Sequence, residues 1–123
     1  MKHVIYDYDF VVIGAGLAGI MAAVSASRHG LKTALINDRP VPGGNAGKEI
    51  RIPSVGAANC NFFYSRESGL TEELLLENLY RNKTRNPEGW HLSLLSFLKR
   101  EPLLDCYYNT YINEVEAEDG QLL

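Results

Sequence analysis

The sequence is poor in the residues that build redox, disulfide and metal sites. It contains two cysteines, Cys60 and Cys106, which are far apart and form no C-x-x-C pair. This pattern excludes a dithiol redox motif, and it favours two buried thiols in a reducing compartment. The three histidines, His3, His29 and His91, have no ligand spacing, so we expect no metal site.

The sequence also lacks a strong charge of either sign and any long apolar run. The net charge is −3, and no basic patch is interleaved with aromatic residues, which argues against a nucleic-acid partner. The apolar runs have the length of strands, so none predicts a membrane span, and residues 1–9 contain no signal-peptide core. With 123 residues, 46% of them hydrophobic, the sequence predicts one small globular domain in the cytoplasm.

What the sequence does contain is a G-x-G-x-x-G motif in the stretch DFVVIGAGLAG, residues 9–19. Four apolar residues precede the motif and an alanine-rich helical pattern follows it, as in dinucleotide-binding βαβ units. Gly14 permits the tight turn, Gly16 lets a pyrophosphate approach the backbone, and Gly19 lets the helix lie close to the sheet. The free N–H groups near Leu17 and Ala18 would meet the phosphates. The stretch therefore predicts a dinucleotide site.

The end of the second predicted strand, residues 32–37, contributes the adenosine contacts in such units. A carboxylate there usually bonds the ribose, but this chain has Asn37, followed by Asp38 and Arg39. The Asn37 amide can hydrogen-bond a ribose hydroxyl. Asp38 is either a ribose contact or a solvated turn residue before a proline.

A second glycine-rich loop follows, in which Gly43 and Gly44 leave room for a ligand and Asn45 offers a donor and an acceptor. The same residues also suit a plain turn. Charged and apolar residues alternate over residues 48–53, which predicts a short strand or an extended segment. Arg51 in this segment is either an anion contact or a surface residue.

The remaining chain predicts two helices and two strands. One helix starts at Leu70; the next has Asn86 as its N-cap and Pro87 at its first position, and Pro102 ends it. Strands are expected over residues 103–108 and 111–117, with a turn at 118–120. The core face of the second helix is predicted to contain Trp90, Leu94, Phe97 and Leu98. The fold class is α/β: a partial Rossmann-type parallel sheet with helices and a C-terminal β-hairpin or meander.

Taken in order, the segments DFVVIGAGLAGIMAA, ALINDRPVPGGNAGKEIR, SRESGLTEELLLENLYRN and LLDCYYNTYINEVEAEDGQL resemble the FAD-dependent oxidoreductases of the glutathione-reductase-like Rossmann type. The D-R-P-x-x-G-G-N segment is similar to one bacterial branch of that family. The resemblance covers residues 8–123 and implies FAD as the cofactor. It assigns Gly14, Gly16, Leu17, Ala18 and Gly19 to the pyrophosphate, Asn37, Asp38 and Arg39 to the adenosine, and Gly43, Gly44 and Asn45 to the path toward the flavin.

Members of that family are several times longer and carry a second Gly-Asp motif and a substrate domain. We therefore expect residues 1–123 to be the incomplete N-terminal part of an FAD- or NAD(P)-binding Rossmann domain. This portion of a flavin-dependent oxidoreductase is expected to be inactive alone and to self-associate. The alternatives are an NAD(P)-binding module, a non-enzymatic remnant, and a subunit completed by a second chain. No residue predicts a catalytic group, and the substrate and electron acceptor stay open.

Overall fold

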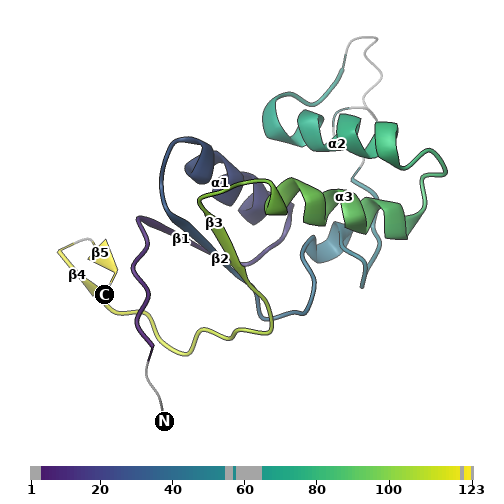
Figure 1. Ribbon diagram of the computed structural model, residues 1–123. Coiled ribbons are helices and arrows are strands. Elements are labelled where there is room, and N and C mark those ends of the chain that lie inside the picture. The colour runs from purple at the N-terminus through teal and green to yellow at the C-terminus, as the bar shows by residue number, and fades with distance from the viewer. Residues whose placement is uncertain (1–3, 55–56, 58–64, 120, 123) are drawn as a thin grey trace.

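A parallel sheet of three strands forms the centre of the fold (Figure 1). The strands are β1 (Phe10–Ile13), β2 (Thr33–Ile36) and β3 (Leu104–Tyr107), with β2 between the other two. In register, Leu35 of β2 lies opposite Val12 on one side and Cys106 on the other. The computed structural model describes residues 4–54, 57, 65–119 and 121–122.

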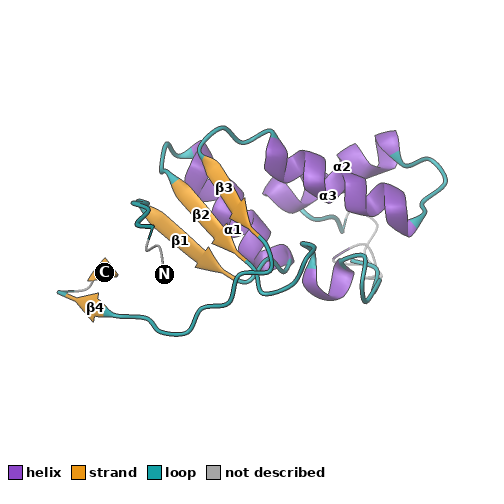
Figure 2. Ribbon diagram, turned by 60° about the horizontal axis from the view of Figure 1, so that its bottom comes forward, coloured by secondary structure: helices purple, strands orange, loops and turns teal. Residues whose placement is uncertain are grey.

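Helix α1 (Leu17–Arg28) covers one face of this sheet, as Figure 2 shows. Its buried residues Ile20, Ala23 and Val24 belong to the same core cluster as Leu35. Gly30, just beyond the helix, has φ +88°, the left-handed conformation that glycine adopts without strain. The predicted strand–helix–strand unit and its glycine cap are confirmed.

A pair of helices, α2 (Gly69–Arg81) and α3 (Pro87–Lys99), lies beside the sheet (Figure 1). The Asn86 side chain caps α3, because its Oδ1 accepts a hydrogen bond from the Gly89 N–H at 2.6 Å. The predicted cap is thus confirmed, and so is the predicted core face. Leu94, Phe97 and Leu98 are buried, and Trp90 packs half-buried against them. None of the described helices has the length and apolarity that a bilayer span requires.

Two of the extended segments expected from the sequence are not strands. Residues 48–50 form a turn after the short 3-10 helix η1 (Gly44–Ala46), and residues 51–54 are irregular. Residues 111–116 are also irregular, and the strand expected there shrinks to β4 (Ala117–Glu118). Alternation alone does not make a strand, since its backbone groups need a neighbouring strand to bond.

The C-terminal hairpin itself is confirmed, because β4 pairs antiparallel with β5 (Gln121–Leu122). In Figure 1 it stands apart from the three helices. Of the two predicted buried thiols, Cys106 packs half-buried against the core, and burial raises its pKa. Cys60 lies outside the described residues.

Arg28, at the end of α1, connects the sheet unit to the helix pair. Its Nε donates to Glu101 Oε1 at 2.9 Å and its Nη1 donates to Glu73 Oε2 at 2.7 Å. Its guanidinium also lies over the Phe97 ring, 5.7 Å from the centroid. Because Glu101 is 8% exposed, its charge needs a partner, and Arg28 is the main one, with Arg100 Nε farther away at 3.6 Å.

We expect Arg28→Met to lower the free energy of unfolding by about 1–3 kcal/mol, because Glu101 would lose its main partner. Urea denaturation followed by circular dichroism measures this change. Arg39→Met is the matched control, since Arg39 and Glu49 form a surface pair at 3.1 Å. Such a pair contributes only about 0–1 kcal/mol. Equal losses in the two variants would contradict the role given to Arg28.

The effect of Arg28→Met should also depend on pH. Hydrogen bonds from Arg28 hold the pKa of the Glu73 carboxyl below its ordinary value. The stability that this pairing contributes is therefore complete above the unfolded pKa of about 4.3 and is lost as the pH falls through the lower folded pKa. The difference between the native chain and the variant should shrink as the pH is lowered through that window.

Candidate cofactor site

The three motif glycines meet different physical requirements at the turn between β1 and α1. Gly14 has φ +102°, and its N–H donates to the Ile36 carbonyl at 2.7 Å, which closes the turn against β2. A Cβ on Gly19 would collide with the Gly14 carbonyl oxygen. A Cβ on Gly16 would have no heavy atom of the described chain within 4 Å. Gly14 and Gly19 therefore shape the turn, whereas the space over Gly16 is open.

The first turn of α1 borders this open space. Gly16 is its N-cap residue, with φ −69° and ψ 172°, and a glycine has no side chain to bond the first N–H groups. The first turn, Leu-Ala-Gly-Ile, also contains no acidic residue. These N–H groups and the helix dipole favour an anion.

The segment that contains Gly43 and Gly44 lies directly against the turn. The Gly43 N–H donates to the Ala15 carbonyl at 2.7 Å, and Gly43 and Gly16 form an isolated parallel bridge. Gly43 has φ +113°, and a Cβ on Gly44 would lie 3.1 Å from the Gly16 Cα. The two loops thus meet backbone to backbone, which side chains at these glycines would oppose.

Asn37 links both loops to the end of β2. Its Oδ1 accepts from the Ala15 N–H at 3.1 Å, while its Nδ2 donates to the carbonyls of Arg39, at 3.2 Å, and Val41, at 3.1 Å. Asn37 is 8% exposed. Its amide therefore connects the glycine turn to the loop that follows β2. The ribose contact predicted for Asn37 from the sequence stays a prediction.

Asp38 and Arg39 follow on the exposed side of the same turn. The Arg39 Nη1 donates to Glu49 Oε2 at 3.1 Å, so its charge is partly compensated. Asp38 is exposed next to it at the end of β2, where a ribose contact is expected.

A cavity of about 340 Å³ opens between the two loops. Of the residues predicted from the sequence, Gly16, Leu17, Ala18, Gly43 and Asn45 line it. Gly14, Gly19 and Gly44 shape the loops behind it, and the three predicted adenosine residues are outside its lining. The prediction from sequence missed four further lining residues, Ala46, Ile52, Pro53 and Ser54. The D-R-P-x-x-G-G-N segment ends just before Ala46 and could have indicated that residue, but it contains no signal for Ile52, Pro53 and Ser54.

Comparison with known proteins identifies the family. The chain matches the family described as FAD dependent oxidoreductase over residues 9–123. It belongs to that family. FAD is the cofactor that membership implies, and the chain is an FAD-binding portion of such an oxidoreductase. Family membership therefore favours the FAD-binding hypothesis over the NAD(P)-binding module.

The chain is also similar to soluble pyridine nucleotide transhydrogenases. It is 50% identical over 50 residues to the protein of Azotobacter vinelandii, a match that covers 41% of this chain and 11% of that protein. It is 51% identical over 49 residues to the protein of Hahella chejuensis, covering 40% of this chain and 11% of that one. The match with the protein of Ectopseudomonas mendocina is 46% over 50 residues, 41% of this chain and 11% of the relative. Each match thus spans about a ninth of the relative's length.

The different surroundings of Gly16 and Gly19 give a test of the turn. Gly19→Ala should lower the free energy of unfolding by about 1–3 kcal/mol, because the new methyl group collides with the Gly14 carbonyl. Gly16→Ala is the matched control and should change stability by no more than about 0.5 kcal/mol. Urea denaturation of both variants measures this difference, and a more destabilised Gly16→Ala would be evidence against this turn geometry.

Proposed function

We propose that the chain binds the ADP half of FAD across the two loops. In this proposal the pyrophosphate lies over Gly16 and bonds the N–H groups of Leu17 and Ala18, and Gly43, Gly44 and Asn45 follow the cofactor toward its flavin end. The observation that carries the proposal is the open space over Gly16 beside an uncapped helix N-terminus. Backbone N–H groups at such a terminus are suited to phosphate.

For the adenosine, we propose that Asp38 accepts a hydrogen bond from the ribose and that Asn37 positions the turn that contains Asp38. The support is that the Asn37 amide already bonds three backbone groups around the turn. In this proposal Arg39 would lie near the ribose, and its guanidinium is paired with Glu49. An arginine paired in this way is less available to a 2′-phosphate.

When bound, FAD supplies the hydride and electron transfer of the family. The residues of this chain bind and orient its phosphate and adenosine groups. For the whole protein we propose oxidoreductase activity in the cytoplasm, with the substrate contacts shared between this chain and further residues or a second chain.

The proposal predicts that Gly16→Val abolishes FAD binding and leaves the fold intact. The branched side chain fills the space over the backbone, and the extended conformation at Gly16 accepts valine. Calorimetric titration with FAD measures binding, and circular dichroism measures the fold. Ala22→Val, on an exposed position of α1, is the control that should keep FAD affinity. Retained FAD binding in Gly16→Val would refute the site.

A further prediction concerns the choice of nucleotide. FAD should bind more tightly than NAD, and NADP no better than NAD, because the Asp38 carboxylate repels a 2′-phosphate. Asp38→Asn should weaken FAD binding and narrow the gap between NAD and NADP. Affinities measured at one salt concentration check this order. If NADP ranked first, Arg39 would be the phosphate partner instead.

A further inference from the structure

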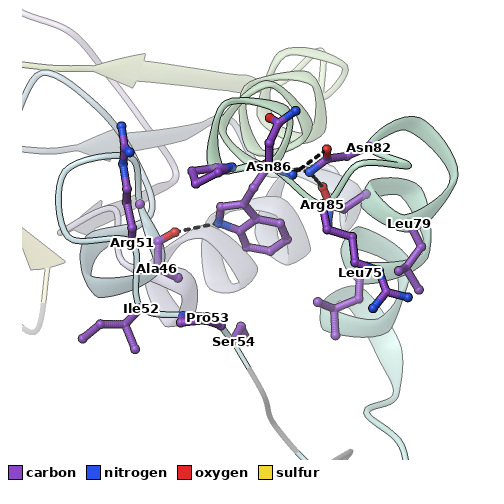
Figure 3. Close-up of a pocket in the computed structure, with 14 residues that line it drawn as sticks. Ala46, Arg51, Ile52, Pro53, Ser54, Leu75, Leu79, Asn82, Arg85 and Asn86 are labelled. Atoms are coloured by element: carbon purple, nitrogen blue, oxygen red, sulfur yellow. Dashed lines mark hydrogen bonds between the residues drawn. The ribbon is translucent and has the colours of Figure 1, made fainter.

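A second and larger cavity, of about 530 Å³, lies between η1, α2 and α3 (Figure 3). We call it the helix-pair cleft. Ala46, Ile52, Pro53 and Ser54 line both this cleft and the cofactor cavity, so the two are adjacent and share this wall. Its volume falls in the range of about 300–1,000 Å³ that is typical of small-molecule sites.

The walls of the cleft are apolar and its charged lining residues are basic. Leu75 and Leu79 of α2 form one side and Ile52 and Pro53 the other (Figure 3). Trp90 of α3 also lines the cleft. Among the described residues that line it, none is acidic and two, Arg51 and Arg85, are basic. The lining therefore suits a ligand with an apolar body and a negative charge.

The two arginines differ in how far their charges are already compensated. Arg51 Nη2 lies 3.2 Å from Glu88 Oε1, and its Nε donates to the Lys48 carbonyl at 2.9 Å. Arg85 makes no ion pair with any residue that the structure describes. In Figure 3 its side chain lies along the wall formed by Leu75 and Leu79. Arg85 is thus the guanidinium available to an anion in the cleft.

The turn between α2 and α3 holds Arg85 in an uncommon conformation. Arg85 has φ +53°, a left-handed value that non-glycine residues seldom adopt. The buried Asn82 side chain clamps this turn, because its Nδ2 donates to the Asn86 carbonyl at 2.8 Å and its Oδ1 accepts from the Asn86 N–H at 3.1 Å. Backbone strain that is held in this way is concentrated at functional sites.

We propose that the helix-pair cleft binds a small organic carboxylate with an apolar body, and that Arg85 pairs with the carboxylate. The inference rests on the proposed function, since the wall shared with the cofactor cavity would bring this ligand next to the cofactor, where a substrate of the flavin must lie. The apolar group of the substrate then lies between Trp90 and the leucines of α2, and its charged group lies at the α2–α3 turn.

Benzoate and its uncharged isostere benzamide are suitable probes, because they differ in the charge that Arg85 would bind. Trp90 is the only tryptophan of the chain, so its fluorescence reports on the cleft directly. We expect benzoate to bind about tenfold more tightly than benzamide, the effect of one charge-assisted hydrogen bond. Arg85→Gln should remove this preference and leave benzamide binding unchanged, and Arg85→Lys should keep most of it.

Arg81→Gln is the matched control, because Arg81 carries the same charge on α2 but pairs with Glu77 outside the cleft. It should bind both probes as the native chain does. Thermal unfolding checks that each variant is folded. Equal binding of the two probes, native-like benzoate binding by Arg85→Gln, or the absence of benzoate binding would overturn the inference.

Calorimetry with the FAD-saturated chain separates this inference from the proposed function. Benzoate should still bind there, and it should also bind to Gly16→Val, which has lost FAD. If FAD displaces benzoate, the cleft holds the cofactor itself and the inference is wrong. If the chain binds benzoate but not FAD, the proposed cofactor site fails instead.

Discussion

The backbone contact between the glycine turn and the Gly43 loop is the constraint on which the site depends. Gly43 and Ala15 are joined by a hydrogen bond of 2.7 Å, and Gly44 approaches the Gly16 Cα so closely that only glycine fits without displacement. Asn37 completes this arrangement by bonding the Ala15 N–H from the end of β2. The amide of this buried asparagine is already bonded to the backbone. It therefore fixes the loops that a pyrophosphate would contact.

The helix pair is coupled to the same loop. The Trp90 indole N–H donates to the Ala46 carbonyl at 2.6 Å, and Ala46 lines both cavities. At the opposite end of the pair, Arg28 bonds Glu73 and Glu101 and so ties α1 to α2 and to the residue that follows α3. These two sets of hydrogen bonds, from Trp90 and from Arg28, therefore fix the position of the helix pair relative to the glycine turn. A ligand in the cleft and a cofactor in the neighbouring cavity would share one wall, which contains Ala46, Ile52, Pro53 and Ser54.

Several elements of the fold could be predicted because their signals are local. The apolar run into Gly14, the left-handed Gly30 and the Asn86–Pro87 helix start each act within one turn of chain, and the structure has all of them. The irregular course of residues 48–54 and 111–116 could not be predicted, since alternation specifies a strand only where a neighbouring strand is available. The partners of Asn37 were missed for a similar reason. They depend on how the chain returns at Val41 and on the distant Ala15.

The two cavities also differ in whether their signals are local in the sequence. Phosphate binding by backbone N–H groups requires little more than a helix start and glycines at fixed spacing. A short stretch of sequence is therefore enough to predict such a site. The helix-pair cleft is built from segments that only the fold brings together: Ile52 from an irregular loop, Leu79 from α2 and Trp90 from α3. From the sequence, Trp90 was predicted as a core residue and Arg51 as either an anion contact or a surface residue, and nothing in the sequence connected them. Only the fold shows what Arg85 could bind, since the clamped turn holds its guanidinium, which has no ion pair among the residues that the structure describes, beside an apolar wall.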